Sequence, residues 1–243
     1  RPKRKDKTML KSYLRTAIRN FLKNKLYSFL NVFGLAIGLA TCLLIMLYVR
    51  DELSYDRFHE KADRIYRVNN EIKFGDNYFD VAQTPALLGP EAVRQIPQVE
   101  QYTRLRWYGS FMARKGASNV REGRVAYADS TLFEVFSFDM ISGDASTALK
   151  DPRSMIITER IANKYFNRTD VAGQQMLIND TATYTVTGVI KDIPGNSHFN
   201  FNFFLPSGMR FKIKNSILQY PLWATEQVHR LRDRSDLPAI LDM

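Results

Sequence analysis

The longest run of uncharged, mainly apolar residues lies between Lys25 and Arg50. These 24 residues contain one strongly polar side chain, Asn31, near the start of the run. As a helix the run would be about 36 Å long, enough to cross a hydrocarbon layer of about 30 Å. A helix packed on one side of a soluble domain would normally show a polar face, which this run lacks. We therefore predict a transmembrane helix over residues 26–49.

Residues 9–25 have the period of an amphipathic helix. Apolar side chains recur at the spacing i, i+3, i+4, i+7 on one side. A basic stripe repeats every four residues on the other side: Lys11, Arg15, Arg19 and Lys23. Beside a membrane span, such a helix is expected to lie in the cytoplasmic interface and contact lipid; a short soluble helix is the alternative. Residues 1–8 show no period, so we predict a disordered basic extension.

The positive charge is confined to the N-terminal side of the apolar run. Residues 1–25 contain ten Lys or Arg and one acid, whereas residues 50–243 contain 25 basic and 24 acidic residues. The body is therefore nearly neutral, which argues against a nucleic-acid partner. Basic residues flanking a span favour the cytoplasmic side. We expect a cytoplasmic N-terminus, with everything after Arg50 outside that membrane.

Two processing signals are alternatives to a retained span. A secretory signal has a shorter apolar region and a small-residue cleavage site, and this run has neither. The stretch "LATC" resembles a lipoprotein lipobox at Cys42, but Thr41 departs from that pattern and more apolar residues follow. Gly34 and Gly38 form G-x-x-x-G, a spacing that permits close packing of a second membrane helix; incidental small residues are the alternative.

The rest of the chain predicts an α+β domain over residues 50–205. Extended segments are expected near residues 65–72, 99–106 and 121–127, and helices over 85–96, 130–136 and 158–166, with Thr158 as the N-cap of the last. A β-hairpin should turn at Asn179 and Asp180. In "HFNFNFF", Phe199, Phe201 and Phe203 alternate as on one strand face. Because strands and helices mix without regular βαβ spacing, the class is α+β.

Four segments in order resemble ABC transporter permeases of the MacB/FtsX type. They are "NKLYSFLNVFGLAIGLA", "YVRDELSYDRFHEKADRIYRV", "YADSTLFEVFSFDMISGDASTALKDPRSMIITERIANKYF" and "YTVTGVIKDIPGNSHFNFNFF". The resemblance spans about residues 9–205. It implies a cytoplasmic amphipathic helix, a first transmembrane helix and a mixed α/β periplasmic core domain in the inner membrane of a bacterium.

The resemblance also implies partners and a mode of action. ATP would be hydrolysed by a separate ABC ATPase subunit, and the permease would pass that conformational change across the membrane by mechanotransmission, for efflux or for lipoprotein or peptide handling. A permease homodimer or heterodimer and a periplasmic partner are further implied. Residues 206–243 do not resemble the family, and the apolar patch at 217–224 is too short to span. Three later membrane helices are missing, so we expect an incomplete fragment.

Candidate chemistry in the chain is sparse. His59, His198 and His229 lack metal-ligand spacing, and the nucleotide-binding P-loop and the G-x-S-x-G elbow are absent from the sequence. Ser197 and His198 are adjacent, a poor geometry for a nucleophile and its base. An acidic cluster is interleaved with basic residues, which predicts a solvated, salt-bridged helix face rather than a cation site: Asp51, Glu52, Asp56, Glu60 and Asp63. We expect no catalytic, metal or cofactor site.

Two other classes of function stay open at this level. A single-pass membrane-anchored sensor or scaffold would use its outer domain to bind a ligand. A membrane-anchored exported hydrolase would carry a catalytic centre that these residues do not reveal. An ABC ATPase partner distinguishes the permease from both.

Overall fold

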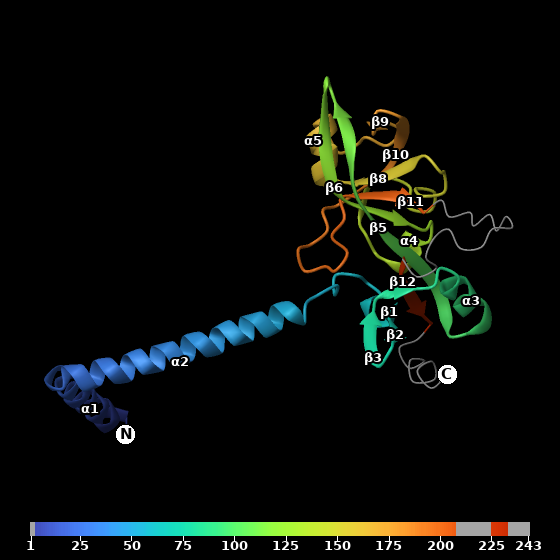
Figure 1. Ribbon diagram of the computed structural model, residues 1–243. Coiled ribbons are helices and arrows are strands. Elements are labelled where there is room, and N and C mark those ends of the chain that lie inside the picture. Colours follow the sequence, from blue (N-terminus) through green and yellow to red (C-terminus); the bar gives the residue numbers. More distant parts are fainter. Residues whose placement is uncertain (1–2, 208–224, 233–243) are drawn as a thin grey trace. The chain divides into compact units, whose positions relative to one another are not determined.

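The computed structural model describes residues 3–207 and 225–232, and the chain divides into two units, Arg1–Ser54 and Tyr55–Met243. The first unit consists of two helices, α1 (Lys3–Lys23) and α2 (Lys25–Glu52), seen in Figure 1. They meet at Asn24, whose N–H donates to Asn20 O and whose carbonyl accepts from the N–H of Ser28. Hydrogen bonding thus continues through the change of direction.

The helix limits differ slightly from the sequence prediction. Residues 3–8, expected to be a disordered extension, continue α1 back to Lys3. Four of these six residues are Lys or Arg, which are good helix formers, and no proline interrupts them. The apolar helix α2 ends at Glu52, and no residue within it is buried. It is long and apolar enough to cross a membrane.

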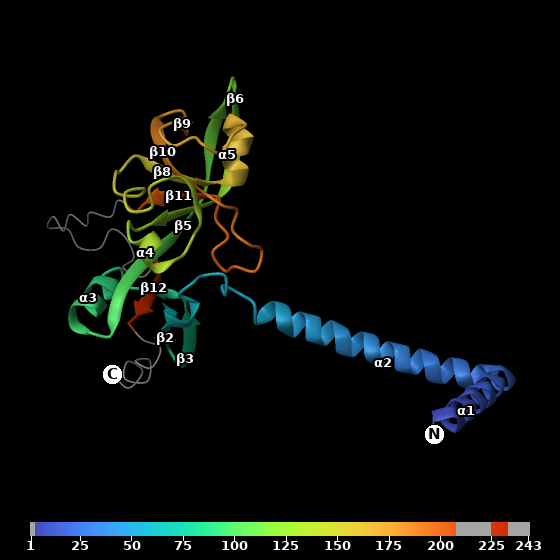
Figure 2. The same cartoon turned by 180° about the vertical axis from the view of Figure 1, so that it is seen from behind.

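The second unit is built on a mixed sheet that runs in the order β1-β12-β5-β6-β11-β8-β10-β7, with β4 beside β12 and β9 beside β10 and β5 (Figures 1 and 2). A separate hairpin pairs β2 with β3. The strands are β1 Ile65–Val68, β2 Asn70–Phe74, β3 Asn77–Val81, β4 Gln83–Thr84, β5 Val99–Lys115, β6 Ser118–Ala128, β7 Met140–Gly143, β8 Ser154–Thr158, β9 Gln175–Ile178, β10 Ala182–Ile190, β11 Phe203–Pro206 and β12 Thr225–Leu231. The helices are η1 Ala62–Arg64, α3 Leu88–Gln95, α4 Leu132–Val135 and α5 Glu159–Phe166.

The α+β class is therefore confirmed. The three expected helices of the body appear as α3, α4 and α5, and the expected strands as β1, β2, β5 and β6. Thr158 occupies the N-cap position of α5, although its side chain makes no capping hydrogen bond. The turn between β9 and β10 also agrees, because Asn179 and Asp180 have φ of 50° and 56°. Asn and Asp tolerate this left-handed conformation better than most residues.

The core lies on both faces of the central strands. Along β8, Met155 and Ile157 pack with α5 on one face, whereas Ile156 packs with α4 on the other. Along β11, Phe203 and Phe204 divide in the same way. In a strand that is covered on both faces, apolar residues follow one another in the sequence instead of alternating with polar ones.

Two sequence predictions fail against this sheet. Phe199 and Phe201 do not share a face with Phe203: β11 begins only at Phe203, and the first two pack in the other core cluster with Phe204. The core does not end at 205 either, because β12 lies between β1 and β5. The polar sequence of β12 hides its role, since His229 and Arg230 are buried beside Val228. The patch at 217–224 lies outside the described residues.

Replacing Gly143 with alanine should destabilise the core domain by about 2 to 3 kcal/mol. Gly143 has φ of +97°, and a Cβ there would collide with the carbonyl oxygen of Thr187 and lie 2.9 Å from Cα of Gly188. Gly173 is the matched control: it has φ of +89° but nothing within 4 Å of a Cβ. Gly173→Ala should therefore cost only the conformational strain, about 1 kcal/mol. Thermal unfolding of both variants tests this, and equal losses would contradict the packing argument.

Candidate functional site

Asp56, near the start of the second unit, makes several hydrogen bonds with segment 196–198. Its N–H donates to the carbonyl oxygen of Asn196 (3.0 Å). One carboxylate oxygen accepts from Ser197 Oγ (2.7 Å) and from the N–H of His198 (3.2 Å). The other lies 2.6 Å from Nδ1 of His198. We call these four residues, Asp56, Asn196, Ser197 and His198, the Asp56 junction.

The local backbone explains why an aspartate occupies this place. Asp56 has φ of +55°, in the left-handed region that Asp adopts more readily than most non-glycine residues. In this conformation both its N–H and its carboxylate bond to the same segment. Asn196, Ser197 and His198 follow Pro194-Gly195, a turn-forming pair, so two turns meet at the junction.

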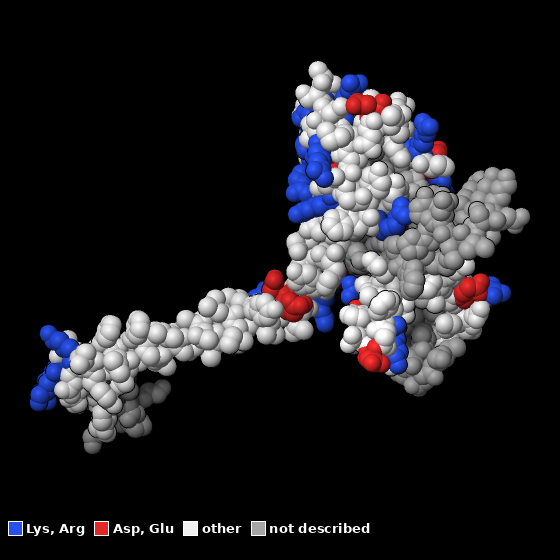
Figure 3. All heavy atoms as spheres, viewed as in Figure 1, with Lys and Arg blue, Asp and Glu red and all other residues white. Residues whose placement is uncertain are grey.

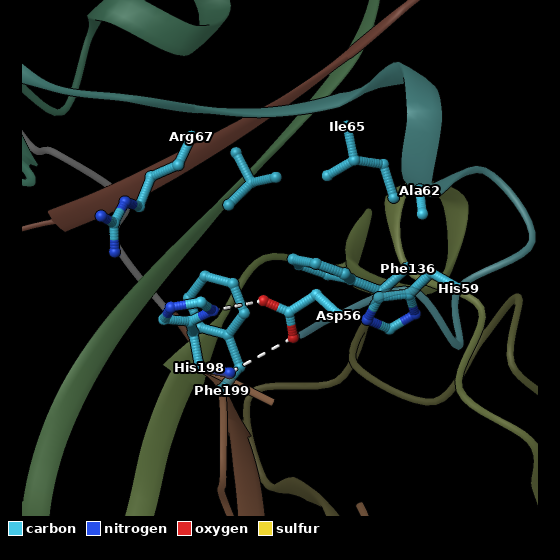
Figure 4. Close-up of a pocket in the computed structure, with 9 residues that line it drawn as sticks. Asp56, His59, Ala62, Ile65, Arg67, Phe136, His198 and Phe199 are labelled. Carbon is cyan, nitrogen blue, oxygen red and sulfur yellow. Dashed lines mark hydrogen bonds and ion pairs between the residues drawn. The ribbon is translucent and has the colours of Figure 1, made fainter. Parts of the chain in front are cut away.

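A cavity of about 250 Å³ lies beside the junction. Figure 4 shows His198 facing the Asp56 carboxylate on one side of the cavity and the ring of His59 on the other side of Asp56. Much of the remaining wall is apolar. The lining residues are Asp56, His59, Ala62, Ile65, Arg67, Phe136, His198, Phe199 and Val228.

His59 is a buried, uncharged member of this wall. Its Nδ1 accepts from the N–H of Ser137 (3.2 Å), and its ring lies 4.0 Å from Phe58 and 4.9 Å from Phe136, centroid to centroid. Burial lowers the pKa of His59 to about 4, against the opposing charge of Asp56. The ring is therefore neutral near pH 7 and stabilises the wall by packing.

The arrangement of Asp56, Ser197 and His198 does not form a catalytic relay. In a serine relay the imidazole accepts the proton of the hydroxyl. Here Ser197 Oγ donates directly to the Asp56 carboxylate, which also binds His198. The three side chains therefore have a structural role: they join the turn at Asp56 to segment 196–198. The residues of the junction are about 140 positions apart in sequence, and no spacing pattern pairs them.

The predicted salt-bridged helix face over residues 50–64 is wrong. Helix α2 ends at Glu52, and turns rather than a helix follow it. Asp56 is bound to segment 196–198, and Arg64 lies 3.6 Å from Glu100. These long-range partners took the place of the expected neighbours. Among the described residues, no group of three or more His, Cys, Asp or Glu side chains could hold a metal ion.

A second polar feature is the ion pair between Arg104 and Asp129, whose side chains are 11% and 10% exposed. Nε and Nη2 of Arg104 lie 2.7 and 3.0 Å from the two carboxylate oxygens, and Nη1 donates to the carbonyl oxygen of Ala86. Ser207 Oγ adds a donor to Asp129. Burial opposes the charge on Arg104, but the hydrogen bond and charge of Asp129 raise its pKa.

The residues predicted to face the membrane lie in the first unit. Gly34 and Gly38 are in α2, and a Cβ at either would meet nothing within 4 Å. The basic stripe lies along α1: Lys11, Arg15, Arg19 and Lys23. Their roles in helix packing and lipid contact stay predictions.

Residues 28–241 match the family described as the MacB-like periplasmic core domain. The chain belongs to this family. The match begins inside α2 and includes β12, so the MacB-like region extends past the limit at 205 that the sequence suggested. It also confirms the resemblance to MacB-type permeases. The family is a periplasmic permease domain rather than a catalytic one.

Two solved structures share the fold of this MacB-like chain. A domain of a permease protein from Porphyromonas gingivalis is 24% identical, covers 76% of this chain and 81% of its own, and has a TM-score of 0.61. The periplasmic region of MacB from Actinobacillus actinomycetemcomitans is 14% identical, covers 74% and 83%, and has a TM-score of 0.50. A search of curated proteins gave no match.

Asp56→Asn should lower the free energy of unfolding of the MacB-like domain by about 2 kcal/mol. The amide removes the charge and one acceptor, so Ser197 or His198 loses its partner. Thermal unfolding of the full chain in detergent measures the loss. Asp76→Asn, at an exposed position in the turn between β2 and β3, is the control and should change little. A loss no larger than the control's would show that the junction adds no stability.

Proposed function

We propose that the chain is the membrane-anchored permease component of an ABC transporter, with its core domain outside the cytoplasm. The observation that carries this is the unbroken family match from residue 28, inside the apolar helix, to residue 241. Helix and core are therefore parts of one family unit. A periplasmic domain attached to an apolar helix fits a protein of the bacterial inner membrane with an extracytoplasmic domain.

The proposed orientation has the N-terminus in the cytoplasm. Ten basic residues precede the apolar run, and the body beyond it is almost neutral. Cytoplasmic flanks of membrane helices carry such an excess of Lys and Arg. Helix α1 would then lie in the inner leaflet with its basic stripe toward the lipid headgroups.

The proposed action is mechanotransmission, for efflux or for lipoprotein or peptide handling. A separate ABC ATPase would supply the energy, and α2 would pack on a second permease helix through Gly34 and Gly38. The Asp56 junction supports this role. It ties Asp56, the residue four positions beyond Glu52, to segment 196–198 of the core. A residue held to the core so soon after the helix would be well placed to receive a displacement passed along the chain.

The test of the proposed function is recovery of its ATPase. The tagged full chain is expressed in the bacterium that it comes from and crosslinked in intact cells. It is then purified from membranes and analysed by mass spectrometry. An ABC ATPase subunit enriched over an unrelated membrane bait supports the permease role. A stable, membrane-inserted chain that recovers none would overturn the proposal and favour a single-pass sensor or scaffold.

Reversing the basic stripe is expected to disturb the orientation of α2. In a chain with glutamate at Lys11, Arg15, Arg19 and Lys23, the excess of positive charge before the span falls from nine to about one. Protease accessibility of the core in spheroplasts reports the orientation. Gln at the same four positions is the control, since it removes charge without reversing it and should have a smaller effect. An unchanged orientation in both variants would contradict the charge argument.

A further inference from the structure

A row of cations crosses one side of the MacB-like core where α5 lies beside the hairpin β5–β6. Figure 3 shows the Lys and Arg side chains gathered on this side, over the α5 and β6 region of Figure 1. The members of the row are Lys115 on β5, Arg124 on β6, and Arg160 and Lys164 on α5, all exposed. We call these four residues the α5 basic face.

Hydrogen bonds show that these cations share one side of the core. Lys115 Nζ donates to the carbonyl oxygen of Lys164 (2.6 Å), which links the hairpin to α5. Arg160 and Lys164 are four residues apart, so they project from the same side of the helix. Asn202 connects Arg160 to Arg124: its side chain accepts from Arg160 (2.6 Å) and its N–H donates to Arg124 O (2.7 Å).

The backbone at Arg124 is bent to place that side chain. The register between β5 and β6 shifts near Gly109, and Arg124 has φ of +57°. Bulges of this kind re-aim a side chain and persist where the surrounding structure holds them. Here the re-aimed guanidinium reaches Asn200 Oδ1 (3.1 Å).

The positive charge of the face is largely uncompensated. Glu122 is the carboxylate beneath it, and this side chain is buried and already bound by Lys164 and Tyr165. At the N-terminus of α5, Asp192 accepts from the backbone N–H of Arg160. Among the described contacts, both guanidiniums are held by neutral amide oxygens of Asn200 and Asn202, which orient them without neutralising them.

We propose that the α5 basic face docks an acidic polypeptide segment of a partner protein in the outer compartment. Held guanidiniums match carboxylates in paired, charge-assisted hydrogen bonds. Helix α5 exposes no large apolar side chain, whereas β5 exposes Trp107, Tyr108 and Met112, so the choice between a peptide and a lipid surface is left to the binding experiment below. We commit to a protein segment because paired carboxylates complement the two guanidiniums, and tighter binding of lipid would overturn this choice. This goes beyond the proposed transport role and does not depend on an ATPase.

The experiment measures peptide binding at the α5 basic face itself, because the basic N-terminus would also attract an acidic peptide. In the full chain in detergent, Cys42→Ser removes the one native cysteine and Asn163→Cys places an environment-sensitive dye between Arg160 and Lys164. The dye is titrated with a 12-residue peptide of alternating Glu and Gly. A saturable, salt-sensitive signal is expected.

The variants decide the assignment. Arg124→Gln with Arg160→Gln should raise the half-saturating peptide concentration about tenfold. Lys150→Gln with Arg153→Gln removes the same charge from two exposed residues elsewhere on the core and should change it less than about twofold. Equal melting temperatures of the two double variants exclude misfolding. Equal effects of both pairs would overturn the proposal. So would equal binding of a Gln–Gly peptide, or tighter binding of short-chain phosphatidylglycerol.

Discussion

Replacing Asp129 with alanine is expected to lower the free energy of unfolding of the core domain by about 3 to 5 kcal/mol. The substitution leaves the guanidinium of Arg104 buried without its counter-charge, and Ser207 without its acceptor. The cost of stranding a charge in the interior exceeds the net stabilisation that the pair provides. Since a domain of this size is stable by about 5 to 15 kcal/mol, much of its stability would be lost.

Two companion variants separate this effect from the simple loss of an ion pair. Asp139→Ala removes an exposed pair, with Lys191 and Asp139 65% and 68% exposed, and should cost less than about 1 kcal/mol. Arg104→Met with Asp129→Leu removes both buried charges and should recover most of the loss. Thermal unfolding in detergent, followed by tryptophan fluorescence, measures all three. A double variant as unstable as Asp129→Ala would show that the stranded charge is not the cause.

Acidification from pH 7.5 to pH 5 is expected to destabilise the core by about 4 kcal/mol through two histidines. Burial lowers the pKa of both His59 and His229 to about 4, with Asp56 opposing the shift at His59. In the unfolded chain both titrate near pH 6.5. Between those values the unfolded chain binds protons that the folded chain does not, so stability is full above about pH 6.5 and falls as the pH is lowered.

The slope of stability against pH is the readout, because any substitution at these sites can also change stability at neutral pH. His59→Gln and His229→Gln should each remove about half of the pH dependence. Calorimetric unfolding in buffers of different ionisation enthalpy gives a second measure, with nearly two protons taken up at pH 5. Uptake close to zero with the native chain would contradict the assignment of two buried, neutral imidazoles.

Local patterns were sufficient for the elements whose partners lie close in sequence. The uncharged run before Arg50 gave a helix long enough to span, since length and apolarity alone decide that. Helix α5 was predictable from its local pattern and from Thr158 at the N-cap position. The turn at Asn179 and Asp180 was legible because few residues accept its backbone angles.

The features that failed or were missed depend on partners far along the chain. Strand β12 carries buried polar residues, and Arg230 is made tolerable there by Glu100 on β5 and by the carbonyl oxygen of Glu134. Phe199 and Phe201 alternate like strand residues, but the strand starts only where β6 and β8 offer hydrogen bonds to Phe203. Alternating apolar residues show that a segment could form a strand with one apolar face. Whether the strand forms depends on the neighbouring strands.

The sequence therefore established a membrane-length helix with one-sided positive charge and an α+β body, because these rest on composition, period and local turn chemistry. The resemblance to MacB-type permeases came separately, from four segments that are similar to that family. The folded arrangement was needed for the Asp56 junction, the buried pair of Arg104 and Asp129, and the α5 basic face. Each joins segments between 25 and about 140 residues apart. Folding alone brings such side chains within hydrogen-bond distance. It also buries charged groups such as Arg104 and Asp129, and burial makes the loss of one partner costly.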